Sequence, residues 1–363
     1  VTKLYATTKR VRKCDAPFGG LQIIIVGDMA QLPPVIASPA HKAIIAVRYG
    51  GNAYFHGSHV WRGFRLIELK ETHRQCNARF VQALNAVRSG VLAPETLTLF
   101  DTRVQARPAG VPALVVTNKR ASEINQTELA ALPGDVSAFQ ATMHGAFDAK
   151  DAPADELLTL KVGARVMLLK NHTLGAWANG DIGTVTSINS EAAEVTVKLD
   201  RAGSVVVERE TWSIMQPQLQ VGTDGQLLIV EKEAGTFSQL PLRLAWAITV
   251  HKAQGLTLDR AHVDLEAGVF THGQTYVALS RVRSLEGLTL ERPLRAGDVI
   301  ADAAATPQRF APLTEVAEQV RGCTAYNSSG RPWLGDTQLP YCSLAKNGCP
   351  RVGATAEMEI AQP

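Results

Sequence analysis

Short apolar runs that end in polar loops alternate with amphipathic segments along this chain, and this alternation constrains its fold most strongly. Leu21–Gly27 contains three isoleucines and a valine, which is typical of a strand buried on both faces of a parallel sheet. Phe64–Leu69 and Ala113–Thr117 are shorter runs of the same kind. The helical patterns Ala78–Arg88 and Lys119–Leu132 follow them. This order predicts an α/β fold.

The pattern changes after about Asp155, where short alternating segments replace the pairs of strand and helix. Asn179-Gly180 and Ala202-Gly203 are typical of turns between antiparallel strands. Strands with this spacing predict a small β-barrel of roughly 80 residues, inserted into the α/β domain. The strands expected in it are Leu160–Lys170, Ile182–Ile188, Val195–Leu199 and Val205–Glu208.

The α/β pattern resumes after the insertion. Leu242–Val250 has the period of a helix, and Ala261–Leu265 is a short apolar run that predicts a strand. Beyond about Leu294 the chain is rich in Ala, Pro, Gly and Ser with weak periodicity, so we expect a weakly structured tail.

Composition excludes some classes of protein. With 363 residues, 45% of them hydrophobic and 20% charged, the chain is long enough for two or three globular domains. Leu21–Val26 is too short to cross a bilayer, so we expect no membrane association. The net charge of +3 says little about partners. The basic cluster of Lys9, Arg10, Arg12 and Lys13 fits either a solvated helix face or a nucleic-acid contact.

The cysteines do not form a metal-binding motif. There are five, an odd number, and none form a CxxC pair, which is typical of reduced thiols in an intracellular protein. The last three lie in the tail, where no histidine follows His272 to complete a zinc site. We therefore predict no metal site among the residues of this chain.

Seven stretches of the sequence, when taken together and in order, are specific enough to indicate a protein family. They are PFGGLQIIIVGDMAQLPPV, LKETHRQ, VVTNKRASEIN, LKVGARVMLLKN, NGDIGTV, LPLRLAWAITVHKAQGLTLD and TYVALSRVRSLEGL. In this order they resemble the Pif-family DNA helicases, which are superfamily-one motors related to RecD that translocate 5′ to 3′. The resemblance runs from about Pro17 to Leu290.

The resemblance implies RecA-like P-loop NTPase motor domains, with ATP and Mg²⁺ as cofactors and single-stranded, forked or duplex DNA as the partner. It implies a helicase of telomere maintenance, DNA repair and recombination, placed in a nucleus or mitochondrion. The sequence does not determine the oligomeric state, for which we expect a monomer. The implied division assigns the end of the first RecA-like domain to residues 1–63 and the second RecA-like domain to 64–155 and 241–295. The barrel takes residues 156–240 and the tail takes 296–363.

One part expected of such a motor is not in the sequence. A phosphate-binding loop needs the pattern GxxxxGK[ST], because backbone N–H groups hold the phosphates and the lysine reaches the terminal ones. No stretch has this pattern, and Asp155-Glu156 follows Ala-Pro-Ala and no apolar strand. The chain also opens on Val1. We therefore expect an N-terminally truncated chain that begins after the magnesium site and is inactive alone.

The candidate nucleotide site follows from the resemblance. Gln31 would contact the γ-phosphate or its attacking water, since a neutral amide can both donate and accept a hydrogen bond. Arg74 and Arg281 would supply the fixed cations that phosphoryl transfer needs, because a guanidinium stays charged and forks toward oxygens. The remaining nucleotide-binding candidates are Gly27, Asp28, Gln254 and Gly255.

The candidate DNA site combines two loops. Thr249, His251 and Lys252 match the motif that contacts single-stranded DNA, and Thr117 with Asn118 match a second DNA-contacting loop. Short hydroxyls and basic side chains suit contact with phosphates without base readout. Trp246 and Tyr276 sit among apolar residues at helical spacing, so we favour core packing over base stacking for both.

Two other functions remain open. One is a non-catalytic remnant of a helicase that binds single-stranded DNA. The presence of Arg74, Arg281 and Gln31 argues against it, because a module that only binds DNA has no use for residues that sense the γ-phosphate. The other is the helicase part of a relaxase or of a RecD-type protein, which predicts a nuclease or relaxase domain upstream.

Overall fold

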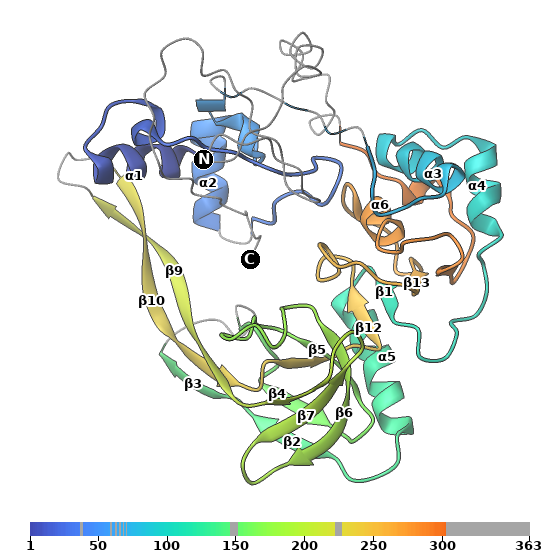
Figure 1. The fold of residues 1–363 in the computed structure, drawn as a ribbon. Helices are drawn as coiled ribbons and strands as arrows, with labels where there is room; N and C mark the ends of the chain where they lie inside the picture. The colour runs from blue at the N-terminus through green and yellow to red at the C-terminus, as the bar shows by residue number, and fades with distance from the viewer. Residues whose placement is uncertain are drawn as a thin grey trace, which may run out of the picture.

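The computed structural model describes residues 1–302, apart from 37–38, several positions between 59 and 70, 146–151 and 222–226. Three groups of elements surround the middle of the molecule (Figure 1). An N-terminal group holds helices α1 and α2, a second group holds a parallel sheet with α3 to α6, and a third is made of antiparallel strands. The last 61 residues, 303–363, lie outside the described part, together with the three cysteines of the tail.

A four-stranded parallel sheet forms the centre of the second group. Its strands are β1 (Ala113–Val115), β12 (Ala247–Thr249), β13 (Ala261–Asp264) and β14 (Leu288–Leu290), in the order β12-β1-β13-β14. All three ladders are parallel, with Val115 opposite both Thr249 and Asp264. The predicted α/β class and the strands at Ala113–Thr117 and Ala261–Leu265 are confirmed.

The predicted helix over Leu242–Val250 is wrong. The segment forms β11 (Leu242–Leu244), which joins the antiparallel sheet, and then β12, which joins the parallel one. All three residues of β12 are buried, because β12 is covered on both faces. A continuous apolar run has no polar positions to mark its period, so periodicity cannot separate a buried strand from a helix.

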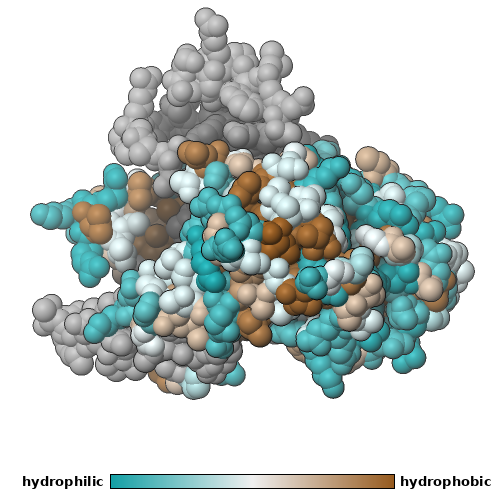
Figure 2. Space-filling model, turned by 90° about the horizontal axis from the view of Figure 1, so that it is seen from below, coloured by the Kyte–Doolittle hydropathy of each residue, from teal (hydrophilic) through white to brown (hydrophobic). Residues whose placement is uncertain are grey.

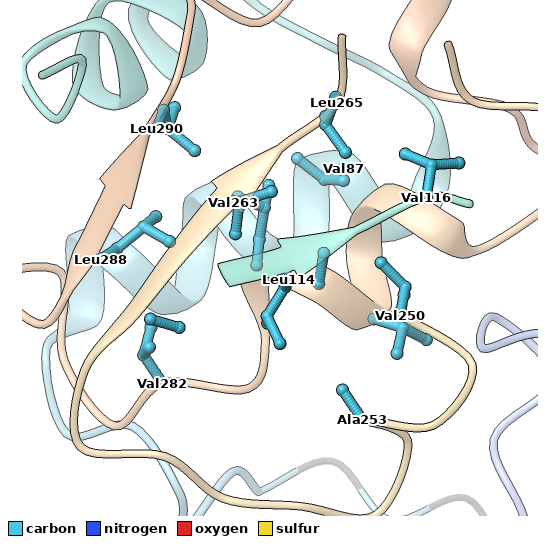
Figure 3. Packing of buried hydrophobic residues seen from close by; sticks show 14 of the residues in the cluster. Val87, Leu114, Val116, Val250, Ala253, Val263, Leu265, Val282, Leu288 and Leu290 are labelled. Carbon is cyan, nitrogen blue, oxygen red and sulfur yellow. The ribbon is translucent and has the colours of Figure 1, made fainter. Parts of the chain in front are cut away.

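Helices cover both faces of the parallel sheet. On one face, α3 (Ala78–Ser89), α4 (Pro94–Asp101) and α6 (Gln274–Leu279) pack on Leu114, Val116 and Val263 (Figure 3). On the other face, α5 (Asn118–Ala131) packs through Ala121 on alternate strand residues. The predicted helices Ala78–Arg88 and Lys119–Leu132 are confirmed. Asn77 caps the start of α3, and Gly90 ends it in the left-handed conformation at φ 75°.

The third group begins as an antiparallel sheet of order β11-β5-β6-β7-β8. Its strands bury a core that includes Val166, Val195, Val197 and Trp246. The bounds are β5 (Arg165–Leu168), β6 (Ile182–Asn189), β7 (Glu194–Leu199) and β8 (Ser204–Val207), with β2 (Ser137–Gln140) pairing β4 (Leu157–Leu160) beside them. All four strand regions predicted here contain strands. The hydrogen bonding among the described residues leaves β8 and β11 as edges, so the sheet is not a closed barrel there.

A long hairpin extends from this sheet and was not predicted. It consists of β9 (Glu210–Val221) and β10 (Leu227–Gln239), and β3 (Thr142–Gly145) pairs with β10. In Figure 1 the hairpin runs toward the side of the molecule that holds α1. On the face seen in Figure 2, apolar side chains gather near the middle among hydrophilic ones.

The N-terminal group contains α1 (Thr2–Arg12), α2 (Pro39–Tyr49) and the short 3-10 turns Pro17–Gly20 and Phe55–Gly57. The predicted buried strand at Leu21–Gly27 is wrong for the described structure. The segment has no ladder partner among the described residues, and Ile24 and Val26 are 53% and 64% exposed. A strand needs a neighbour to satisfy its backbone groups, and none is present here.

Other expectations have mixed outcomes. The described positions of Phe64–Leu69 are not in a strand, and the rest of that segment lies outside the described residues. The basic cluster forms the end of α1, where Lys9 pairs with Asp15 at 3.6 Å and Arg12 donates to the Gly19 carbonyl at 2.7 Å. No helix within the described ranges is long and apolar enough to cross a membrane. Beyond β14 the described chain contains one 3-10 turn, Ala296–Asp298.

Candidate functional site

The loop that follows Gly27 is held in shape by its own side chains. The Asp28 carboxylate accepts from the Ala30 N–H at 3.1 Å and from Gln31 Nε2 at 3.3 Å. The Gln31 N–H donates to the Asp28 carbonyl at 3.1 Å, which closes a tight turn. Leu32 then enters the core of the second group and is 5% exposed. The loop is therefore anchored on the second group of elements.

Three contacts from distant parts of the sequence fix this loop. Arg88 of α3 donates to Asp28 at 3.1 Å, and Gln254 Nε2 donates to Gln31 Oε1 at 3.3 Å. The Asp302 N–H donates to Nδ1 of His272 at 2.9 Å, which leaves the Nε2–H to donate to the Met29 carbonyl at 3.0 Å. The sequence predictions included Gln254 but missed Arg88 and His272.

Gly273 allows the backbone at the start of α6 to come very close to the loop that contains Gln31. It has φ 74°, and a Cβ built on it would lie 2.5 Å from the Gln31 carbonyl oxygen and 2.6 Å from that of Ala30. No side chain fits at that distance, so only glycine lets the start of α6 meet the loop.

Arg281 is buried at the end of α6, with 1% of its surface exposed. Its guanidinium donates to the Val277 carbonyl at 2.8 Å, the Leu256 carbonyl at 3.2 Å and the Ser280 hydroxyl at 2.8 Å. Burial, and then the nearby charge of Arg74, lower the pKa of Arg281 to about 10, so it stays charged at neutral pH.

Arg74 is held beside Arg281 by the same piece of backbone. Its guanidinium donates to the Ser280 carbonyl at 3.1 Å. The neighbouring Gln75 is buried and donates to the carbonyls of Ser280 and Val282 at 3.1 and 2.9 Å. The structure therefore brings the two predicted cations together, although they are 207 residues apart in sequence.

The cluster carries more positive than negative charge. Arg88 and Arg281 interact there with Asp28, and Arg74 lies close enough to Arg281 to repel its charge. Three guanidinium groups against the one Asp28 carboxylate leave two positive charges in excess among these side chains. Tyr276 faces Asp28, and desolvation followed by the Asp28 charge raises the pKa of its phenol. Arg74 and Arg88 are partly buried, and guanidinium groups in such positions bind phosphate oxygens well, so the cluster fits phosphate groups. Among the described residues no set of three His, Cys, Asp or Glu side chains is placed to hold a metal ion.

The predicted DNA contacts leave the sheet at one edge. Because β1 and β12 are parallel neighbours, Thr117 with Asn118 and His251 with Lys252 emerge side by side. Asn118 and Lys252 are exposed. Thr117 caps α5 by accepting from the Arg120 N–H at 3.3 Å, and Thr249 is buried within β12 at 5% exposure. Of these residues, Asn118, His251 and Lys252 offer side chains to a ligand at the surface.

The surroundings change the ionisation of both basic residues at this edge. Desolvation lowers the pKa of His251, so its imidazole is neutral at pH 7. Desolvation and then the charge of Arg243 lower the pKa of Lys252 to about 8, although Asp155 acts in the opposite direction. Lys252 is therefore still mostly charged at pH 7.

One continuous segment joins the two sites. His251 and Lys252 lie at the edge of the sheet where Asn118 emerges, Gln254 contacts Gln31, and the Leu256 carbonyl accepts from Arg281. Gly255, at φ 86°, has no atom within 4 Å of a built Cβ. Gly27 is exposed at the start of the loop.

Comparison with known proteins gives a consistent result. The model of the family described as PIF1-like helicase matches residues 1–96. The chain is 32% identical over 335 residues to the ATP-dependent DNA helicase Pif1 of Psychrobacter sp., covering 78% of this chain and 50% of the relative. It is 36% identical over 300 residues to the mouse ATP-dependent DNA helicase PIF1, covering 79% of this chain and 42% of the relative. The chain thus spans about half the length of the curated relatives it matches.

Solved structures agree with the sequence matches. A crystal structure of Bacteroides Pif1 bound to single-stranded DNA superposes with a TM-score of 0.71 at 31% identity, covering 87% of this chain and 72% of that one. Bacteroides Pif1 in complex with ADP-AlF3 and single-stranded DNA gives a TM-score of 0.70 at 31% identity, with coverage of 88% and 72%. The RecA-like fold predicted from the sequence is therefore confirmed.

Proposed function

Because this chain belongs to the PIF1-like helicase family, we propose that it is part of an ATP-dependent DNA helicase and supplies the nucleotide contacts of the second motor domain. The observation that carries the proposal is the cluster in which Asp28 links Gln31 to Arg281, with Arg74 beside Arg281. The edge with the exposed Lys252 is joined to this cluster through Gln254. A module that only binds DNA needs the edge but has no use for the cluster.

The residues present fit the phosphate end of ATP, which when bound supplies the phosphoanhydride whose cleavage drives the motor. Arg74 and Arg281 stabilise negative charge on the transferred group, because both guanidinium groups are held by protein carbonyls before nucleotide arrives. Gln31 orients the attacking water through its amide, whose position Asp28 and Gln254 fix. Mg²⁺ would be held mainly by residues outside this sequence.

The same proposal places single-stranded DNA along the edge formed by Asn118, His251 and Lys252. The segment from His251 to Leu256 then transmits movement between the DNA and Gln31, since it contacts both sites. We further propose that the complete helicase moves 5′ to 3′ along DNA and acts in telomere maintenance, DNA repair and recombination. Placement in a nucleus or mitochondrion, a monomeric state and the domain boundaries stay predictions, as do the roles of the individual site residues.

We expect this chain by itself to bind single-stranded DNA without hydrolysing ATP, because its sequence contains no phosphate-binding loop. The measurement is phosphate release with and without oligo(dT), beside a binding titration of the same preparation. Turnover that the Arg281→Ala variant abolishes would contradict the expectation. Turnover that survives this substitution in full comes from a contaminating enzyme, and the preparation is then purified further before the test is repeated.

A further inference from the structure

Phe270 exposes a large aromatic ring beside the DNA edge. The residue lies in the loop after β13 and is 62% exposed, and it is the aromatic member of the exposed large hydrophobic side chains in the described part of the chain. Its ring stacks on that of His251, with centroids 6.2 Å apart and planes inclined by 17°. One face of the phenyl ring is therefore supported, while most of its surface remains in water.

The sheet order gives the position of this pair. His251 follows β12 and Phe270 follows β13, and β1 runs between these two strands. A contact between them therefore lies over the carboxyl end of β1, where the chain continues into Thr117 and Asn118. Three loops that leave the same edge thus place an aromatic ring, an amide and the Lys252 ammonium next to one another.

The backbone that carries Phe270 is held in place. Its N–H donates to Oε1 of the buried Gln274 at 3.1 Å, and His272, two residues further on, is fixed to the Met29 carbonyl. Gly273 then touches the loop of Gln31, and α6 leads on to Arg281. The ring is thus presented by an anchored segment that continues directly into the nucleotide cluster.

We propose that Phe270, backed by His251, is a stacking platform for one base of the single-stranded DNA whose phosphates meet Lys252. This inference rests on the proposed function. A phenyl ring has no donor or acceptor, so it stacks on any of the four bases and suits a motor that moves along every sequence. The polar side chains of Asn118 and Lys252 lie around the ring. They are better suited to contact the phosphates that flank a stacked base than to contact an apolar protein surface.

The test uses this chain and fluorescence-labelled oligo(dT), with Kd measured over a range of salt concentrations. We expect Phe270→Ala to weaken binding about 5- to 150-fold, the range found for loss of one stacked base, with an unchanged slope of log K against log salt. The matched comparison is Lys252→Ala, which should lower that slope by about 0.7 because one phosphate contact is lost. Phe270→Trp should keep near-wild-type affinity, since an indole also stacks.

A second measurement identifies the base contact. Single abasic positions are moved along the oligonucleotide, and wild-type chain should show one position with a clear loss of affinity. That loss should disappear in Phe270→Ala, because the stacking partner is already missing. Unchanged affinity of a folded Phe270→Ala variant, or the same abasic profile in variant and wild type, would rule out base stacking on Phe270 and leave the proposed function standing. Wild-type chain that fails to bind oligo(dT) would overturn the proposed function and the platform with it.

Discussion

Replacing Arg281 by alanine in the whole protein should lower the DNA-stimulated kcat by about 10³- to 10⁵-fold, the range for arginines that stabilise transferring phosphoryl groups. Single-stranded DNA affinity should stay near the wild-type value, because Arg281 is 1% exposed and its partners are carbonyl groups and a hydroxyl at the nucleotide cluster. The measurements are steady-state hydrolysis and a DNA-binding titration on the same variant.

Two further variants make this test specific. Arg283→Ala removes a nearby guanidinium that is mostly exposed and pairs with Asp259 at 3.3 Å, so its kcat should stay close to wild type. Arg281→Lys keeps the positive charge but loses the forked hydrogen bonds, so its kcat should fall between those of wild type and Arg281→Ala. A DNA affinity that falls as far as the hydrolysis rate would show that Arg281 holds the fold or the DNA edge.

Replacing Gly273 by alanine should lower kcat by about 100-fold, because the new methyl group would lie 2.5 Å from the Gln31 carbonyl and force the loop away from α6. Displacements of about 1 Å in catalytic groups have effects of this size. The change acts on Gln31 without removing any of its own atoms, so it tests whether the position of that side chain matters.

Gly268 provides a control with the same backbone strain. It has φ 81°, close to the 74° of Gly273, but no atom lies within 4 Å of a Cβ built on it. Gly268→Ala should lose about 1–2 kcal/mol of stability from the left-handed conformation, and Gly273→Ala should lose this amount plus the cost of its clash with the loop. Only Gly273→Ala should lose hydrolysis, and equal rates for the two variants would show that the contact with the loop has no role in catalysis.

Local sequence patterns were enough to predict much of the second group of elements. Helix α3 has an apolar stripe, a capping asparagine and a terminal glycine, and these signals are all contained within 14 residues of sequence. Strands β1 and β13 are short apolar runs between polar loops. This pattern is typical of strands in a parallel sheet that is buried on both faces. Gln31, Arg74 and Arg281 were found through the resemblance, since nothing local marks them as candidate phosphate ligands.

What the sequence could not reveal depends on contacts across the chain. Arg88 lies on an ordinary helix, and only the fold places it 3.1 Å from Asp28, 60 residues away. Phe270 carries no motif, and its role follows from the strand order that sets it against His251. Hairpin β9–β10 has a polar, proline-containing strand, which weakens the period that would reveal it. Leu21–Gly27 has the composition of a buried strand, but burial depends on neighbours that composition does not supply.

We expect the nucleotide cluster and the proposed DNA edge to be coupled through the segment from His251 to Leu256. The most direct test is the Kd of the whole protein for oligo(dT), with and without an ATP analogue that cannot be hydrolysed. The analogue should change the Kd by at least about fivefold, the lower end of typical coupling between sites. This change should be lost in Gln254→Ala, whose Kd without nucleotide should stay at the wild-type value. The same Kd with and without the analogue in wild-type protein would show that the two sites are not coupled.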